Sequence, residues 1–434
     1  MRSERRQKRQ LDTNPTNILS RQNITTSAFK TVARRHPPLH LKPENRLYLP
    51  GTIGQALSLL ITLLLIGACA PSRPSLASAD VVDVLSRPVD DRFARALEPL
   101  AFQFPRDHGP HNEYATEWWY YTGNLTGEDG GEYGFQLTFF RSALAPGESN
   151  RPSDFAAQQI YMAHFAVTSA PAGRHVSFDR FSRGAGGVAG ATGTPRYEVW
   201  LDDWRALEVG PGQMRLQAAA EADSGPVSID LTLTETRPAL LHGEAGYSRK
   251  GPEPGNANHY YSLVRLETAG NIVFGGAQVA VTGLSWMDHE FGTSALSEDA
   301  VGWDWFAVTL DNDVVLMFAE IRTSSGPAQA IFEGTLSFPD GRQVAILPDD
   351  FSLTPTGQWT SPDTGTVYPS GWRVFFPQHE IDLTIDPLID DQEMDVAFSY
   401  YEGATVVRGT MNGEPVAGRG YVELTGYGEG GFQR

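Results

Sequence analysis

Residues 118–140 read WWYYTGNLTGEDGGEYGFQLTFF, which is two aromatic-rich runs on either side of a short polar turn. The first run, Trp118–Leu125, ends in a segment rich in glycine and acidic residues, Gly127–Gly131. The second run, Tyr133–Phe140, alternates between apolar and small or polar side chains. Successive side chains of a β-strand point to opposite faces, so the segment predicts an antiparallel β-hairpin.

Short runs of the same kind continue to the end of the chain, separated by Gly, Pro, Asn and Asp. They lie at 158–168, 196–201, 213–221, 227–235, 258–267 and 277–286, and then at 302–306, 314–321, 328–336, 371–376, 379–385, 395–401, 404–410 and 416–424. No segment beyond residue 100 keeps the 3.6-residue spacing of an amphipathic helix for long. Roughly 20 strands at this spacing predict an all-β chain of two antiparallel barrels or sandwiches, residues 101–295 and 296–434.

The segment before this β-rich part resembles an export signal. Residues 57–66 form an apolar run of about ten residues, too short for a membrane helix of roughly 20 but suited to a signal peptide. The run leads into Ile66-Gly67-Ala68-Cys69, which is typical of a lipobox. We therefore expect a signal peptide over 51–68 and lipidation of Cys69. The alternatives are a buried cysteine after an ordinary apolar helix, a signal without lipidation, or an apolar segment that is retained as an anchor.

Lipidation of Cys69 would also assign the other N-terminal segments and the location of the protein. Residues 69–100 would be a linker, and the basic residues 1–50 either a disordered extension or the result of a start codon set too early. The protein would be anchored in a bacterial cell envelope on the periplasmic side. The outer membrane is favoured because Ala70, rather than Asp, follows the cysteine.

The exported part is strongly acidic. Residues 1–68 hold 11 Lys and Arg and 3 Asp and Glu, so their removal takes the formal net charge from −18 to −26. A protein of this charge is repelled by nucleic acids and by anionic lipid headgroups, which argues against a nucleic-acid partner. Because Cys69 is the only cysteine, structural disulfides and cysteine-based metal sites are excluded.

Several common catalytic motifs are missing from the sequence. Gly283-Leu284-Ser285-Trp286-Met287 lacks the last glycine of a serine-hydrolase nucleophile elbow, and His289-Glu290 has no second histidine at the metalloprotease spacing. The glycine-rich segment 184–190 leads into Thr-Gly-Thr-Pro rather than into a helix, and there is no phosphate-binding loop. We therefore expect neither a serine hydrolase nor a metallohydrolase, and no metal or cofactor.

Two segments concentrate aromatic and ionisable side chains. The first is Glu117-Trp118-Trp119-Tyr120, and the second is Trp286-Met287-Asp288-His289-Glu290-Phe291-Gly292, preceded by Asn258-His259-Tyr260-Tyr261. Together they resemble the AttH-type lipocalin-like family, which is related to the carotenoid 1,2-hydratases (hydroxyneurosporene synthase) and whose members are often labelled predicted secreted hydrolases. The resemblance covers about residues 100–430. It implies two tandem lipocalin-like β-barrel domains, with a deep apolar pocket in or beside the first.

The resemblance also implies a set of catalytic residues. In the related hydratases an aspartate is the proposed acid that protonates an isoprenoid double bond, near a histidine and aromatic rings. That pattern falls on Asp288, His259, Tyr261 and Trp286, although tyrosine and tryptophan are exchanged at the two aromatic positions. On chemical grounds alone, a carboxyl group desolvated among aromatic rings has a raised pKa and can act as an acid near neutral pH. The two ring faces would stabilise the resulting cation by about 0.5–2 kcal/mol each, and His259 would orient the acid or take a proton from water.

The same residues also allow a structural interpretation. Asp288 and its neighbours could close the end of a barrel, and Glu117 could be a hydrogen-bond partner of a neighbouring strand. Trp118 and Trp119 must point to opposite faces of one strand, which predicts one in the core and the other at the rim. The residues expected to contact a ligand are Glu117, Trp118, Trp119, Tyr261 and Trp286.

Two functions of different classes remain open. The first is a cofactor-free enzyme that hydrates, isomerises or cyclises an apolar, isoprenoid-like or polyketide-like substrate, with Asp288 and His259 as catalytic residues. The second is a lipocalin-like carrier or an accessory protein of an envelope ABC transporter, which the resemblance implies because AttH-type genes often neighbour such permeases. In both cases the partner is an apolar small molecule, and a lipid anchor at Cys69 would hold the protein where such molecules concentrate.

Overall fold

The computed structural model describes residues 90–146, 157–293, 296–297, 299–326, 330–397 and 399–428. The expected extension, signal peptide and lipidation site (1–69) lie outside these residues, and so do most of the expected linker and residues 294–295 at the expected domain boundary. The described residues belong to one compact unit that spans Pro74–Arg434. Within them, no helix is long and apolar enough to cross a membrane.

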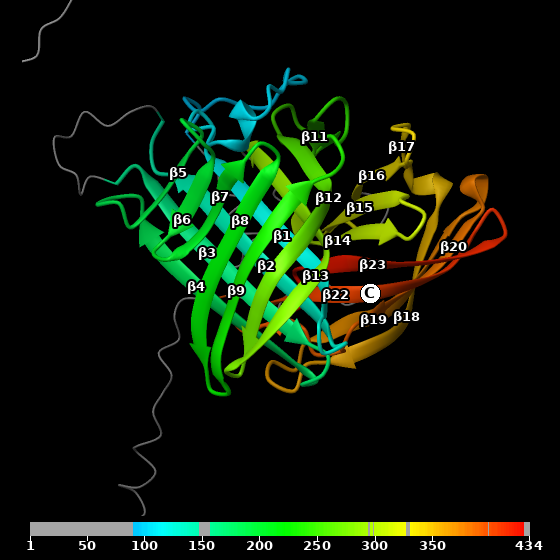
Figure 1. Ribbon diagram of the computed structural model, residues 1–434. Helices are drawn as coiled ribbons and strands as arrows, with labels where there is room; N and C mark the ends of the chain where they lie inside the picture. The colour runs from blue at the N-terminus through cyan, green and yellow to red at the C-terminus, as the bar shows by residue number, and fades with distance from the viewer. Residues whose placement is uncertain are drawn as a thin grey trace, which may run out of the picture. The chain divides into compact units, whose positions relative to one another are not determined.

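The first thirteen strands form one sheet. Their bounds are β1 (Thr116–Gly127), β2 (Glu132–Ala143), β3 (Gln159–Ser169), β4 (Arg174–Arg183), β5 (Ala189–Thr192), β6 (Glu198–Leu201), β7 (Trp204–Gly210), β8 (Gln213–Ala222), β9 (Gly225–Glu235), β10 (Leu240–Leu241), β11 (Tyr247–Arg249), β12 (Ala257–Phe274) and β13 (Ala277–Gly292). The order across the sheet is β4-β3-β2-β1-β13-β12-β9-β8-β7-β6-β5, and β10 and β11 add to β12. The sheet curls into a near-complete barrel, drawn in cyan and green in Figure 1.

The later strands form a second sheet. Their bounds are β14 (Ala300–Leu310), β15 (Val315–Thr323), β16 (Ile331–Ser337), β17 (Gln343–Ala345), β18 (Ser352–Thr360), β19 (Val367–Phe376), β20 (Ile381–Pro387), β21 (Glu393–Met394), β22 (Tyr400–Met411) and β23 (Glu414–Leu424). The order is β17-β16-β15-β14-β23-β22-β20-β19-β18, with β21 on β22, and the sheet curls into a half-barrel, yellow to red in Figure 1. The predicted all-β fold with two lipocalin-like domains is therefore confirmed.

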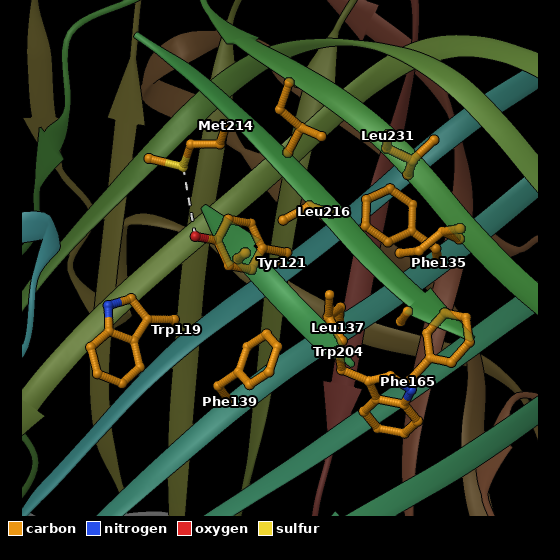
Figure 2. Packing of buried hydrophobic residues seen from close by; sticks show 14 of the residues in the cluster. Trp119, Tyr121, Phe135, Leu137, Phe139, Phe165, Trp204, Met214, Leu216 and Leu231 are labelled. Carbon is orange, nitrogen blue, oxygen red and sulfur yellow. Dashed lines mark hydrogen bonds between the residues drawn. The ribbon is translucent and has the colours of Figure 1, made fainter. Parts of the chain in front are cut away.

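The interior of the first barrel is filled with large apolar side chains. Figure 2 shows Trp119, Tyr121, Phe139 and Trp204 among the side chains of this cluster, which come from several surrounding strands. These positions recur every second residue, because alternate side chains of each strand point inward. Trp119 and Trp204 are fully buried, and truncation of such a residue to alanine costs about 3–5 kcal/mol of stability.

The strands at the centre of the first sheet are buried on both faces. On the side away from the barrel interior, Tyr120, Tyr260 and Trp286 pack against Trp305 and Tyr421 of the second sheet. The two sheets also approach closely at Gly134 of β2, where an added Cβ would lie 2.5 Å from the Cβ of Ala404 on β22. Continuous apolar runs, rather than strict alternation, are the pattern of strands covered on both sides.

Candidate functional site

A mostly apolar cavity of about 140 Å³ lies between the two sheets. One wall is formed mainly by β1, β2 and β13, and the other by β14, β15, β16, β22 and β23. The indole rings of Trp118, Trp303 and Trp305 line it together with Asp288 and Glu423. A cavity of roughly this size accommodates a benzene-sized apolar group. The cavity therefore lies beside the first barrel, and it suits one end of an apolar chain.

Asp288 of β13 is the buried carboxyl group at this cavity. Tyr260 Oη donates a hydrogen bond to Oδ2 over 2.7 Å, Trp286 Nε1 donates one to Oδ1 over 2.6 Å, and Ser262 Oγ also donates to Oδ1. Burial raises the pKa of Asp288 from 3.8 to about 7, although the three donated bonds act to lower that pKa. Among these bonds Oδ2 accepts only one, so it keeps a position for the proton of the neutral acid.

Strand register brings these groups together. In the antiparallel pair β12–β13, Ser262 stands opposite Asp288, and in the pair β1–β13 Tyr120 stands opposite the same residue. Directly opposite residues point to the same face of a sheet. The face that carries Asp288 is the one that meets the second sheet, because Tyr120 packs there against Trp305.

A buried histidine supports Asp288 through Ser262. Nε2 of His242 lies 2.6 Å from Ser262 Oγ, and Nδ1 lies 3.2 Å from Thr335 Oγ1 on β16. Burial, together with the charge of Lys250, lowers the pKa of His242 well below 6.5, so the ring is neutral. Since the Ser262 hydroxyl donates to Asp288, it accepts from Nε2–H of His242, which fixes the tautomer of the ring. The orientation of Asp288 thus depends on both sheets.

An ion-pair network borders the cavity near Asp288. Lys250 Nζ lies 3.0 Å from Glu290 Oε2 on β13 and 3.6 Å from Glu333 Oε2 on β16. It also lies 4.7 Å from the ring centre of Tyr260, the donor to Asp288. Burial acts to lower the pKa of Lys250, but the two carboxylates outweigh it and raise that pKa. Lys250 is therefore charged, and it links the two sheets.

Glu117 lies in a second network on the inner face of the first sheet. His289 Nε2 is 2.8 Å and His111 Nδ1 is 2.9 Å from Glu117 Oε1, and Arg141 Nε donates to Oε2 over 2.8 Å. Burial acts to raise the pKa of Glu117, but Arg141 and the two histidines hold it well below 4.5. The ligand atoms of His111, Glu117 and His289 lie within 4.8 Å of one another. Arg141 already supplies the positive charge that this carboxylate needs, so we interpret the group as an internal ion pair.

The structure separates two of the residues that the sequence analysis placed around Asp288. His259 and Tyr261 lie on the opposite face of β12, turned away from the cavity, and neither lines it. The β12 residues that share a face with Asp288 are Tyr260 and Ser262, the two sequence neighbours of Tyr261. The reason is the two-residue period of a strand, in which a shift of one position moves a side chain to the other face. The expected contact of His259 and Tyr261 with Asp288 is therefore wrong.

The other expected ligand-binding residues occupy different places. Trp118 lines the cavity, and Glu117 also borders it. Trp286 bonds to Asp288 but borders a separate pocket of about 370 Å³ between the sheets. Trp119 is buried in the first barrel, where its Nε1 donates to the carbonyl oxygen of His108 over 2.9 Å. The strand therefore does place one tryptophan in the core and the other at the cavity.

Several residues of the site were missed by sequence reasoning. Trp303 and Trp305 come from the second sheet, as does Glu423, and Trp305 Nε1 donates to Tyr260 Oη over 3.2 Å. Trp303-Asp304-Trp305 is itself an aromatic strand start, which is a visible signal. Nothing in the sequence indicates that this strand faces Asp288, because the two segments belong to different sheets.

Comparison with known proteins identifies the family. A family model described as AttH-like matches residues 95–427, whereas no curated protein matches the chain. A solved structure assigned as AttH from Nitrosomonas europaea is 35% identical with a TM-score of 0.68, and the match covers 77% of this chain and 100% of that one. Kievitone hydratase from Nectria haematococca is similar in fold, at 15% identity and a TM-score of 0.57, over 78% of this chain and 97% of that one. The chain belongs to the AttH-like family.

Proposed function

We propose that the protein binds an apolar, isoprenoid-like molecule in the cavity between its sheets and hydrates a carbon–carbon double bond of that molecule without a cofactor. The observation that carries the proposal is Asp288, a buried carboxyl group at an apolar cavity with a pKa raised to about 7. Such a group is protonated often enough near neutral pH to act as a general acid. The similarity in fold to a protein named as a hydratase supports this reaction class.

The cavity walls suit a cationic intermediate. When Asp288 protonates the less substituted carbon of a trisubstituted double bond, a tertiary cation forms at the neighbouring carbon. Trp118, Trp303 and Trp305 line the same cavity, and each aromatic ring that presents its face to a cation contributes about 0.5–2 kcal/mol. The hydrogen bonds from Tyr260, Ser262 and Trp286 then stabilise the carboxylate that remains.

We propose further that the protein acts at the cell envelope, anchored through a lipid at Cys69. The proposal rests on the lipobox-like sequence after the apolar segment 57–66. Apolar molecules partition into membranes, so an anchored protein would meet its ligand there. Metabolic labelling with an alkyne palmitate analogue tests the anchor. Label on the wild type and not on Cys69→Ser is expected, and label on neither would contradict it.

The first test of the cavity is the identity of a bound ligand. The protein is purified, extracted with organic solvent, and the extract is analysed by mass spectrometry. Ala319 borders the cavity, so Ala319→Phe fills space there and is the matched control. An apolar molecule that is present with the wild type and missing with Ala319→Phe is expected. Equal extracts from both proteins would contradict binding in this cavity.

The second test separates catalysis from carriage. Asp288→Asn keeps the shape of the carboxyl group and removes the acid, so we expect ligand retention to be unchanged and turnover to fall by about 10²–10⁴-fold. Turnover is followed by the uptake of ¹⁸O from labelled water into the extracted ligand. If wild type and Asp288→Asn both retain the ligand and neither incorporates ¹⁸O, the protein is a lipocalin-like carrier or a transporter accessory.

A further inference from the structure

The cavity is bordered by a second acidic side chain that the proposed reaction has not yet used. Glu423 lies on β23, the strand between β14 and β22 in the second sheet. Its half-buried side chain lines the same cavity as Asp288, which belongs to the first sheet. Trp303, whose indole also lines the cavity, donates a hydrogen bond to the carboxyl group of Glu423.

A continuous set of contacts places the two carboxyl groups on opposite sides of one space. Tyr120 stands opposite Asp288 in the pair β1–β13. The Tyr120 hydroxyl crosses to the second sheet and donates to Glu402 Oε2 over 2.7 Å. Glu402 stands directly opposite Glu423 in the pair β22–β23. Because opposite residues share a face, Glu423 is turned toward the same interface as Tyr120 and Asp288.

The surroundings of Glu423 disfavour its charged form until the pH rises above neutrality. Burial raises the pKa of Glu423 from 4.5 to about 8, the bond from Trp303 acts against this, and the negative charges of Asp288 and Glu290 add to the rise. Other charged or titratable groups border the same cavity, or contact a residue that does: Glu117, Tyr120, Arg141, Arg249, Lys250, Glu333, Tyr400 and Glu402. Arg141 is engaged by Glu117, and Lys250 by Glu290 and Glu333.

We propose that Glu423 is a second catalytic carboxyl group, which accepts the proton of the water that attacks the cation formed by Asp288. This inference rests on the proposed hydration reaction. It assigns the role of proton acceptor, which His259 cannot fill because its side chain lies on the other face of β12. It also explains why the site needs both sheets, since each supplies one carboxyl group.

The reaction balances with these two groups. The Asp288 carboxyl gives its proton to one alkene carbon, a C–H bond forms, and the π bond is lost to leave a tertiary cation. The water oxygen forms a C–O bond to that cation, and one water proton passes to the Glu423 carboxylate, which gives a tertiary alcohol. The proton on Glu423 then returns to the Asp288 carboxylate through water, so the only net change is addition of one water molecule. The active form therefore carries one proton on the pair, and that proton must be on Asp288. Because the pKa of Glu423 lies above that of Asp288, this arrangement is the less populated of the two one-proton forms.

An ammonium ion that mimics the tertiary cation tests the inference without a known substrate. We would measure by calorimetry the binding of N,N-dimethyloctylamine, which stays charged from pH 6 to 8.5, and of N,N-dimethyloctanamide, a neutral molecule of nearly the same size and shape, as a measure of cavity occupancy. The amine should bind the wild type more tightly as pH rises and the two carboxyl groups ionise. Glu423→Gln should weaken amine binding at pH 8.5 about tenfold and reduce the pH dependence, with binding of the neutral probe unchanged.

Matched variants guard against a mere loss of folding. Glu423→Asp keeps the carboxyl group and should retain most of the pH dependence, while Glu414→Gln, an exposed residue on the same strand, should behave as the wild type. If Glu423→Gln binds the neutral probe and also binds the amine with wild-type affinity and pH dependence, the assignment of Glu423 is overturned. If the wild type binds neither probe, the proposed ligand site itself fails, and the role of Glu423 fails with it.

Discussion

Three donors surround one carboxyl group at Asp288, and each of them comes from a residue that shares its face of the sheet. Of the three donors, Ser262 has a histidine partner of its own, because His242 Nε2 lies 2.6 Å from its hydroxyl oxygen and donates a hydrogen bond to it. A donor that bonds to a carboxylate stabilises the charged form and lowers the pKa. The value of about 7 for Asp288 is therefore a balance between burial and these bonds.

Ser262→Ala should raise the pKa of Asp288 further above 7, because it removes one of the bonds that stabilise the carboxylate. The measurement is a pH titration of the infrared C=O stretch of protonated carboxyl groups, with the Asp288 band assigned by its loss in Asp288→Asn. Ser285→Ala is the control, since Ser285 lies on the same strand as Asp288 but bonds to Thr268. A band in Ser262→Ala that titrates at or below the wild-type pH would show that Ser262 does not control this acid.

The predicted partners of Asp288 on β12 were wrong because they lie on the other face of the strand. Asp288 and Trp286 do contact each other, but Tyr260 replaces Tyr261 and Ser262 replaces His259 as partners. Both tyrosines of β12 are aromatic, so composition cannot distinguish them. Only the register with β13 decides which one faces Asp288, and register depends on long-range pairing that the sequence does not show.

Strands β1, β12 and β13 carry large side chains on both faces. This pattern made the strands predictable from the sequence, but not the elements that cover them. Alternation and turns are local properties, so the strands and the fold class followed from the sequence. In β1, Trp119 and Tyr121 fill the first barrel, while Trp118 and Tyr120 meet the other sheet. Aromatic side chains on both faces indicate that a strand is covered twice, but they do not name the element that covers it. The sequence therefore indicated the part of the candidate site that belongs to the first sheet, but not the part that the second sheet contributes.

Gly134 on β2 is a point of close approach between the two sheets. Its added Cβ would lie 2.5 Å from the Cβ of Ala404, so Gly134→Ala should overpack the interface and lower the free energy of unfolding by about 1–3 kcal/mol. Adding Ala404→Gly should restore most of the loss, because the two substitutions exchange one Cβ between the sheets. Urea denaturation measures both.

Gly210→Ala serves as the control for Gly134→Ala. At Gly210 the nearest atom to an added Cβ is the flexible end of Gln213, at 3.3 Å, so little loss of stability is expected. If Gly134→Ala and Gly210→Ala prove equally stable, or if Ala404→Gly brings no recovery, the close approach of β2 and β22 is not a stability determinant.

Several acidic side chains at the interface between the sheets have raised pKa values, so their charged forms are disfavoured. Burial raises the pKa of Asp288 to about 7 and that of Glu423 to about 8, and burial with the charge of Glu423 raises the pKa of Glu402 well above 4.5. Oε1 of Glu402 has no hydrogen-bond partner among the described residues. For each group the folded state binds the proton more tightly than the unfolded state does. Their stabilising contribution is full below about pH 4 and is lost as the pH rises toward the folded pKa.

Buried histidines impose the opposite dependence. Burial lowers the pKa of His108 to about 4 and that of His164 to about 3, from 6.5. Between those values and pH 6.5 the unfolded chain binds more protons, so the histidines' contribution is full above pH 6.5 and is lost as pH falls. Above pH 6.5 only the acidic groups of these two sets still change, so the free energy of unfolding should fall as the pH rises from 6.5 toward 8.

Glu402→Gln isolates the acidic part of this dependence, because the amide side chain keeps an acceptor for Tyr120 and cannot ionise. Each unmatched proton changes the free energy of unfolding by about 1.4 kcal/mol per pH unit, so between pH 6.5 and 8 the wild type should lose up to about 2 kcal/mol more than Glu402→Gln. Urea denaturation at pH 5, 6.5 and 8 measures this. Because the unfolded chain already loses the Glu402 proton near pH 4.5, the wild type should also gain up to about 2 kcal/mol relative to Glu402→Gln between pH 6.5 and pH 5. Equal losses above pH 6.5 would mean that Glu402 is already ionised in the folded protein. The interface would then have to hold several negative charges at once, which its apolar walls make costly.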